Sequence, residues 1–234
     1  MSKTNRVAMI TGAAGNLGRA VATALAADGL RLVLVGNSLA HLKAAFPQAP
    51  ADWRMVEVDL TDQAASDTRL GATVSDVGGV DVLCAIAGAF RMGEPVHATS
   101  TETWDAMIDV NVRTLLNAVR PVVPGMIASG RGQIITIGAA SAQHGLAAMG
   151  AYTAAKSAVM RLTEAMAAEL GGKGINVNGV LPSVIDTPQN RAAMPDADPK
   201  AWVSPDDLAA VIRFLASDQA KAINGALIPV TGRG

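Results

Sequence analysis

One tyrosine and one lysine of this 234-residue chain have the types and spacing needed for acid–base chemistry. Tyr152 and Lys156 have i, i+4 spacing in an Ala-rich stretch that predicts a helix, so both side chains fall on one helical face. An ammonium group beside a phenol favours the phenolate and lowers the pKa of the tyrosine. Such a phenol can donate a proton to a developing alkoxide, or accept one from an alcohol, near neutral pH. The pair therefore predicts an acid–base centre.

A glycine-rich turn near the N-terminus has the spacing of a phosphate-binding loop. Segment 11–18, Thr-Gly-Ala-Ala-Gly-Asn-Leu-Gly, follows a predicted strand and opens a predicted helix. Small residues there let the backbone approach a pyrophosphate, which amide N–H groups and the helix dipole hold. Tight packing of helix on strand is the alternative use of such glycines. The residues expected at the phosphates are Gly12, Gly15, Asn16, Leu17 and Gly18.

Two further strand ends carry residues suited to an adenosine group. Asp59, followed by Leu60, can accept a hydrogen bond from an adenine amine; the alternative is a cap for the next helix, for which Asp62 is also suited. Asn37 and Ser38 follow the second strand, where NAD sites usually have Asp or Glu and NADP sites a nearby Arg. Either side chain can bond a hydroxyl or a phosphate, so NAD(H) and NADP(H) both stay open.

Short β-rich runs alternate with longer Ala- and Leu-rich segments, which is typical of βαβ units on a mostly parallel sheet. Strands are expected at 6–11, 31–35, 53–58, 80–85, 133–137, 175–180 and 226–229. Helices are expected at 16–28, 38–45, 62–77, 101–129, 151–171 and 205–217. The sequence predicts one α/β domain over 1–234: a Rossmann-type, doubly wound sheet of about seven mostly parallel strands with helices on both faces.

The least regular segment is 182–203, which has four prolines and too little periodicity for a long helix. It follows the sixth predicted strand. In open α/β sheets, ligands bind outside the carboxyl ends of the strands. We therefore expect 182–203 to be a substrate loop.

Composition narrows the range of partners. The formal net charge is −1 and Lys/Arg runs are lacking, so neither nucleic acid nor an anionic membrane is expected. Apolar runs have strand length, which is too short for a membrane span, and the N-terminus has no room for a signal peptide, so a cytoplasmic location is expected. Cys84 cannot form an internal disulfide and lies in an apolar run. No metal site is expected, and a small-molecule substrate fits best.

The order of these features resembles the short-chain dehydrogenase/reductase family over essentially the whole chain. The features that carry the resemblance are the glycine turn, Val58-Asp59-Leu60, Asn111, Tyr152-x-x-x-Lys156 and Leu181-Pro182. The resemblance implies an NAD(P)-dependent oxidoreductase with Tyr152 as acid/base. It also implies that Lys156 holds the nicotinamide ribose and lowers the tyrosine pKa, and that Asn111 holds its helix and a relay water. The alternative for Asn111 is an exposed helix residue.

The same resemblance extends the predicted cofactor site. Thr187 would contact the nicotinamide carboxamide, or would simply form a turn before Pro188. The remaining residues expected at the cofactor are Tyr152 itself, Ala87, Gly88, Pro182 and Ile185.

Three departures from the family pattern stand out. The usual middle glycine is Asn16, and the usual Asn-Asn-Ala-Gly after the fourth strand is Ala-Ile-Ala-Gly at 85–88. The position of the catalytic serine is Ala139. Ser141 is the nearest hydroxyl that could polarise a substrate in its place, and His144 in the same loop faces either substrate or solvent.

The loop 182–203 resembles the substrate loop of dihydropteridine reductases, which also have alanine in place of the serine. That resemblance implies reduction of an electron-poor quinonoid dihydropterin by NADH, although the Asp of those enzymes after the second strand is absent. Another carbonyl, alcohol or imine substrate remains open. The alternative from a different class is a non-catalytic NAD(P)-binding sensor, which the retained Tyr152, Lys156 and Asn111 oppose.

Helices 101–129 and 151–171 carry small and apolar residues on more than one face. A lone helix on a sheet buries only one stripe, so the excess predicts a subunit interface. Members of the family that the chain resembles commonly form tetramers through these helices. A homo-oligomer, tetramer or dimer, is therefore expected; the alternative is an Ala-rich helix with weak amphipathicity.

Overall fold

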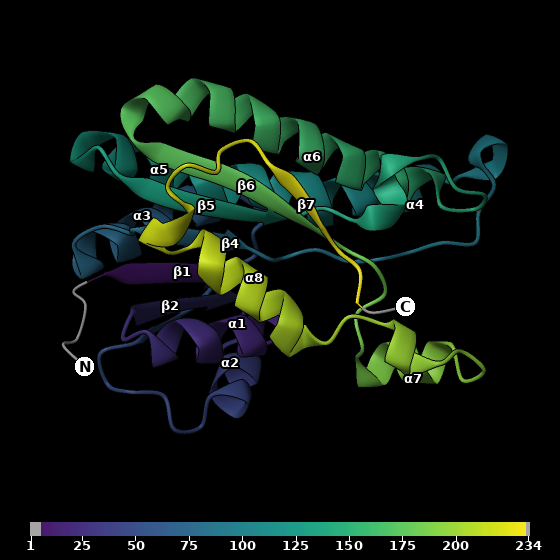
Figure 1. Cartoon of the computed structure of the whole chain (residues 1–234), viewed down its shortest axis with the longest axis horizontal. Helices are drawn as coiled ribbons and strands as arrows, with labels where there is room; N and C mark the ends of the chain where they lie inside the picture. The colour runs from purple at the N-terminus through teal and green to yellow at the C-terminus, as the bar shows by residue number, and fades with distance from the viewer. Residues whose placement is uncertain (1–5, 233–234) are drawn as a thin grey trace.

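Seven parallel strands form the central sheet of the computed structural model, which describes residues 6–232 (Figure 1). The strand order is β3-β2-β1-β4-β5-β6-β7, so the chain changes direction across the sheet between β1 and β4. The strands are β1 Val7–Thr11, β2 Arg31–Gly36, β3 Arg54–Glu57, β4 Val82–Ala85, β5 Gly132–Ile137, β6 Ile175–Pro182 and β7 Leu227–Val230. The predicted single-domain, doubly wound Rossmann-type fold is confirmed, and its ligand crevice is expected where β1 and β4 end.

Helices cover both faces of the sheet. On one face lie α1 Asn16–Ala27, α2 Leu39–Ala45 and α8 Pro205–Leu215; on the other lie α3 Gln63–Val77, α4 Thr101–Ile108, α5 Thr114–Ser129 and α6 Gly150–Leu170. All predicted strands and helices are present, with ends that differ by at most two residues; the predicted helix 101–129 is divided into α4 and α5 by a π-helical turn. No helix within the described part of the chain is long and apolar enough to span a bilayer.

Side chains of each strand point alternately to the two faces of the sheet, and they form two apolar cores, one on each face. In β1, Ala8 and Ile10 pack with α1 and α8, whereas Val7 and Met9 pack with the α3 and α5 side. Successive side chains of a strand point to opposite faces, so a strand buried on both faces needs apolar residues throughout. This explains why the predicted strands are continuous apolar runs.

The predicted helix 101–129 is present over its whole length, but its middle turn is not α-helical. A π-helical segment, Asp109–Arg113, separates α4 from α5. Within it, the side-chain amide of Asn111 donates to the carbonyl of Met107 (3.0 Å), and the backbone N–H of Thr114 reaches back to the carbonyl of Asp109. Because a side chain competes for a carbonyl of the helical ladder, the backbone widens by one residue at this point.

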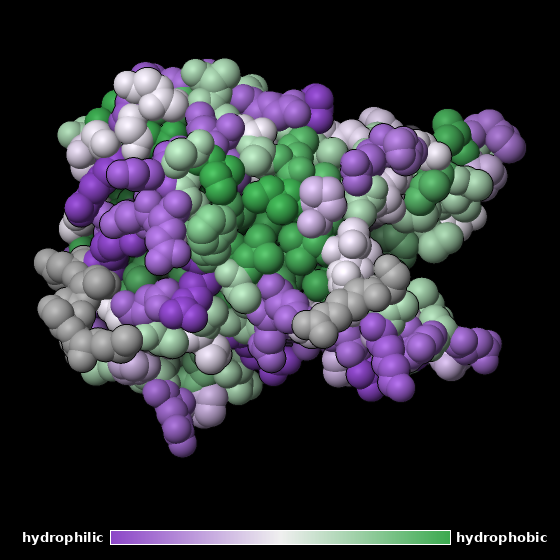
Figure 2. Space-filling view, viewed as in Figure 1, coloured by the Kyte–Doolittle hydropathy of each residue, from purple (hydrophilic) through white to green (hydrophobic). Residues whose placement is uncertain are grey.

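The segment 182–203 forms a loop closed at its base. Ile185 and Val203 form an isolated parallel bridge, and the loop between them carries the short helix α7 (Pro188–Ala193). Figure 2 shows a hollow on the right of the molecule, between the projection that carries α7 and the one that carries the 3-10 turn η1 (Val96–Ala98). The carboxyl ends of the strands meet on this side, so the hollow is the place to look for the site (Figure 1).

Candidate active site

The glycine turn packs backbone against backbone at the ends of β1 and β4. Gly12 has a φ of +63°, which favours glycine, and a Cβ there would lie 3.1 Å from the backbone N and Cα of Ala87. A Cβ on Gly18 would collide with the carbonyl oxygen of Gly12 and lie 2.7 Å from the Cα of Ala13. The turn therefore brings Gly12, Gly18 and Ala87 together with no room for larger residues.

The first turn of α1 is left open to an anion. Its N-cap is Gly15, which offers no side-chain acceptor, whereas Ser38 and Asp62 cap α2 and α3 with their side chains. Uncapped N–H groups at the positive end of a helix bind phosphate. The turn thus fits the pyrophosphate of a dinucleotide, with Leu17 buried beneath it and Asn16 at the first helical position.

Thr11 is a residue that sequence reasoning missed. Its buried hydroxyl oxygen accepts hydrogen bonds from the N–H groups of Ile86 (3.0 Å) and Ala87 (3.1 Å). These bonds fix the segment after β4 against the end of β1. The signal for it was a hydroxyl in the last position of an otherwise apolar strand.

Two of the predicted residues, Asn111 and Lys156, converge on the backbone of a third, Gly88. A Cβ on Gly88 would lie 2.7 Å from Oδ1 of Asn111 and 3.2 Å from Nζ of Lys156. Lys156 is only 6% exposed and donates to the carbonyl of Ile137, the last residue of β5 (2.9 Å). The predicted Gly88, Asn111 and Lys156 therefore form one cluster at the carboxyl edge of the sheet.

Asn111 is buried, so the alternative of an exposed helix residue is wrong. Its amide donates to the carbonyls of Ala89 and Met107, both at 3.0 Å, and its Oδ1 accepts from the N–H of Ala89 (3.2 Å). The side chain thus ties the π-helical segment to the segment after β4. It positions the backbone beside Lys156.

Tyr152 lies on α6 one turn before Lys156 and is partly buried. Its ring packs against the apolar cluster that contains Ala139, and Phe90 contacts it edge-on, with 4.8 Å between ring centroids and an interplanar angle of 83°. Phe90 was missed by sequence reasoning, because nothing in the order of residues placed it near the tyrosine. It is 56% exposed, so part of an aromatic side chain is open to solvent beside the tyrosine.

Burial moves the pKa values of both acid–base groups towards their neutral forms. It raises the pKa of Tyr152 to about 12 and lowers the pKa of Lys156 to about 8. The sequence predicted the opposite direction for the tyrosine. In this structure the Lys156 ammonium donates to Ile137, and desolvation dominates the phenol.

The segment after β5 holds the departure from the family pattern. Ala139 is buried at 3% exposure and has a methyl group where the family pattern has the hydroxyl of a serine. Ser141 lies in the following 3-10 turn, Ala140–Gln143, and is partly exposed, while His144 is exposed. The role of Ser141 as a substitute donor stays a prediction.

Of the residues predicted to contact the adenosine, only Ser38 caps a helix. Asp62 caps α3, so the cap alternative for Asp59 is wrong; Asp59 accepts instead from the N–H and hydroxyl of Thr61. Asp59 is exposed and Leu60 buried, whereas Asn37 is exposed and Ser38 accepts from the N–H of His41. The adenosine contacts of these residues stay predictions.

The substrate loop reaches the cofactor turn. Gln189 of α7 accepts a hydrogen bond from the side-chain amide of Asn16 (2.8 Å). Thr187 caps α7 by accepting from the N–H of Asn190 (3.1 Å), which is the turn role that the sequence left open. Pro182 is buried at the end of β6, and Ile185 lies in the bridge that closes the loop. Within residues 6–232, no cluster of three or more metal-binding side chains occurs.

Comparisons with known proteins agree on one family. A family model described as short chain dehydrogenase matches residues 6–198. L-xylulose reductase of Bos taurus is 34% identical over 97% of this chain and 95% of that protein. Levodione reductase of Leifsonia aquatica is 30% identical over 98% of this chain and 94% of that protein.

A solved structure extends the likeness to three dimensions. The crystal structure of 3-ketoacyl-(acyl-carrier-protein) reductase from Brucella melitensis, complexed with NADH, is similar with a TM-score of 0.88. The two chains are 28% identical, and the match covers 99% of this chain and 98% of that one.

Proposed function

The chain belongs to the short-chain dehydrogenase family and is an NAD(P)-dependent oxidoreductase, and we propose that Tyr152 is its acid/base towards a small carbonyl, alcohol or C=N substrate. The observation that carries the proposal is the convergence of Lys156, Asn111 and Gly88 one helical turn from Tyr152. A catalytic dyad fits this cluster better than the alternative, a non-catalytic NAD(P)-binding sensor. A sensor has no need of a desolvated lysine beside a desolvated phenol.

The residues at the strand ends fit a dinucleotide. Gly12, Gly15, Asn16, Leu17 and Gly18 would hold the pyrophosphate; Asn37, Ser38, Asp59 and Leu60 would contact the adenosine; Ala87, Gly88, Lys156, Pro182, Ile185 and Thr187 would contact the nicotinamide riboside. When bound, the nicotinamide supplies or accepts the hydride.

The proton chemistry then falls to Tyr152. Because burial holds its pKa near 12, the phenol keeps its proton at neutral pH and suits donation during reduction. Oxidation of an alcohol requires the phenolate, and positive charge near the ring favours that form. Lys156 is the cation closest in sequence on the same helical face.

The substrate we propose is planar and electron-poor. With alanine at position 139, Tyr152 is the main donor to the reacting atom, unless Ser141 assists. A substrate that accepts hydride readily needs less polarisation by hydrogen bonds. The exposed ring of Phe90 beside Tyr152 supports a flat, unsaturated partner, because aromatic faces stack on such rings. A quinonoid dihydropterin is the first such substrate to test.

The test is oxidation of NADH or NADPH, followed at 340 nm, with a quinonoid dihydropterin, a cyclic diketone and a simple ketone. We expect turnover of the first or second, and a loss of about 10²- to 10⁴-fold in kcat in Tyr152→Phe. Ser75→Ala removes an exposed hydroxyl from α3 and serves as the matched control. Equal, measurable turnover in Tyr152→Phe and the wild type would refute the acid/base role, whereas cofactor binding without turnover of any substrate would favour the sensor.

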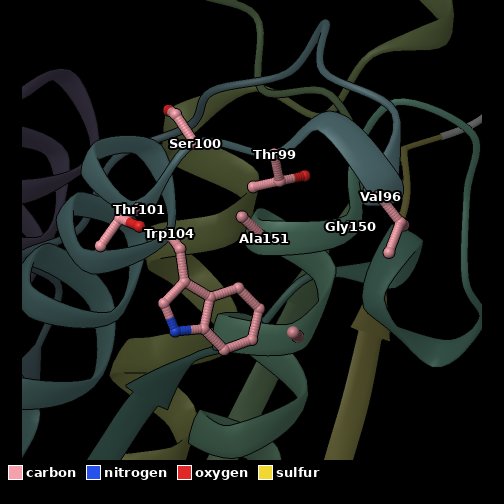
Figure 3. Close-up of a pocket in the computed structure, with 8 residues that line it drawn as sticks. Val96, Thr99, Ser100, Thr101, Trp104, Gly150 and Ala151 are labelled. Carbon is pink, nitrogen blue, oxygen red and sulfur yellow. The ribbon is translucent and has the colours of Figure 1, made fainter.

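We also propose that the chain forms a homo-oligomer through α4 and α6. Figure 3 shows Trp104 of α4 across from Gly150 and Ala151 of α6, in a cavity of about 440 Å³. Trp104 is 46% and Val96 76% exposed, so a second copy that covers this surface would bury apolar area. Light scattering after gel filtration should give a dimer or tetramer that Trp104→Ser weakens and Val184→Ser, in the substrate loop, does not.

A further inference from the structure

A carboxylate stands at the end of β2, although the sequence places none there. In the pairing of β2 with β3, Gly36 lies opposite Glu57, the last residue of β3. Oε1 of Glu57 accepts a hydrogen bond from the backbone N–H of Leu39, the first residue of α2 (2.9 Å). The side chain of Glu57 therefore crosses from the neighbouring strand to the turn that Gly36, Asn37 and Ser38 form.

This turn is where dinucleotide-binding folds distinguish their cofactors. An acidic side chain after the second strand accepts hydrogen bonds from the adenosine ribose, whereas an arginine there accommodates the 2′-phosphate of NADP. The chain itself has Gly36 and Asn37 at that point, with no charge. Tertiary structure supplies the missing negative charge from the next strand.

Two backbone donors at the start of α2 are already used. The N–H of Leu39 is bonded to Glu57, and the N–H of His41 is bonded to the hydroxyl of Ser38 (3.3 Å). To accept from these N–H groups, a 2′-phosphate would have to displace the Glu57 carboxylate from the N–H of Leu39 and the Ser38 hydroxyl from the N–H of His41. A 2′-phosphate beside the Glu57 carboxylate would bring two negative charges together, and like charges repel.

The arginines nearest to Glu57 are directed elsewhere. Arg69 donates to the backbone carbonyl of Glu57 (2.9 Å). This carbonyl points away from β2, because Gly36 lies opposite Glu57 and accepts its hydrogen bond from the N–H of the next residue, Val58. Arg54 pairs with Asp76 of α3 (3.0 Å). Lys43 stands in the last turn of α2, four residues after Leu39 and therefore on the same helical face. Neither Arg54 nor Arg69 therefore pairs with the Glu57 carboxylate.

We propose that Glu57 makes the protein selective for NAD(H), by accepting a hydrogen bond from the adenosine ribose and by repelling a 2′-phosphate. The inference rests on the dinucleotide binding of the family and not on the proposed substrate, so it stands or falls separately from the acid/base role of Tyr152. Asn37, which is exposed beside it, is placed to add a neutral hydrogen bond.

The experiment is calorimetric titration of the full chain with NADH and with NADPH, which needs no substrate. We expect the wild type to bind NADH at least about tenfold more tightly than NADPH, and Glu57→Gln to reduce that ratio about tenfold, mainly through tighter NADPH binding. Glutamine keeps an oxygen for the N–H of Leu39, so the variant isolates charge from structure.

Two further variants make the result decisive. Glu57→Asp keeps the charge and should keep the preference for NADH; Glu169→Gln removes a carboxylate from the exposed end of α6 and should leave both affinities unchanged. Circular dichroism establishes that each variant is folded. A wild type that binds NADPH as tightly as NADH, or a Glu57→Gln variant with the wild-type ratio, would overturn the proposal.

Discussion

The glycine turn and the substrate loop meet at one edge of the sheet, yet they are built in opposite ways. In the turn, Gly12, Gly18 and Ala87 bring backbone atoms so close that an added methyl has no space. In the loop 182–203, most side chains are exposed, and polar contacts such as the ion pair of Arg191 with Asp186 (2.6 Å) hold it together. Backbone geometry therefore defines the cofactor side, and a few side chains define the substrate side.

This difference predicts where mutations act. On the cofactor side, volume is the sensitive variable, because the contacts are between backbone atoms that cannot move independently. On the substrate side, chemistry is the sensitive variable, because exposed side chains can be exchanged with little effect on folding. Four experiments test the contrast.

The largest effect is expected from Gly18→Ala. The new methyl would collide with the carbonyl of Gly12, so we expect a loss of about 3 kcal/mol in the free energy of unfolding and of measurable NADH binding. The matched control is Gly71→Ala in α3, where a Cβ meets nothing within 4 Å. It should stabilise the protein by about 0.5–1 kcal/mol. Urea denaturation measures the free energy of unfolding of both variants. An equal change in Gly18→Ala and Gly71→Ala would show that the cofactor side is no more sensitive to added volume than the rest of the molecule.

The next effect concerns Lys156, which lies between the two sides. Its folded pKa, about 8, is below the ordinary 10.5, so between these values the unfolded chain binds more protons and the free energy of unfolding rises with pH. Below pH 8 the burial penalty is fully present. We expect Lys156→Met to be more stable than the wild type by about 2 kcal/mol at pH 7, and the gap to shrink as the pH approaches 10.

Urea denaturation at pH 7, 8, 9 and 10 measures this gap. Lys173→Met, which changes an exposed lysine, should show no gap at any pH. A difference between Lys156→Met and the wild type that is constant with pH would contradict the prediction.

A smaller effect is expected from Ala139→Ser, which restores a hydroxyl on the substrate side. A donor near the reacting oxygen should raise kcat/KM for a simple ketone about tenfold, and less for an electron-poor substrate that needs little polarisation. The change in specificity ratio is the measurement, and Ala140→Ser in the adjacent turn is the control. An equal factor for both substrates would show that position 139 does not face the reacting atom.

The smallest effect is expected where the two sides touch. Asn16 and Gln189 share an exposed hydrogen bond of 2.8 Å, and such bonds contribute little against water. A double-mutant cycle of Asn16→Ala and Gln189→Ala should give a coupling of about 0.5 kcal/mol in NADH binding. Strict additivity would mean that the loop and the cofactor turn act independently.

Much of the fold could be predicted from sequence because its signals are local. The apolar runs of β1 and β4 and the caps at Ser38, Asp62 and Ser204 involve residues near one another in the chain. The π-helical turn between Ile108 and Thr114 could not be predicted, since it depends on where the side chain of Asn111 finds its partners.

The candidate site divides in the same way. Spacing alone placed Tyr152 and Lys156 on one face of a helix, and the glycine turn at the end of a strand. Only tertiary structure decided that Lys156 bonds Ile137, that Phe90 covers Tyr152, and that Glu57 reaches the end of β2. Periodicity and spacing specify which residues share a helix or strand. Strand order and register decide which helices and strands meet, and both arise from the packing of the whole chain.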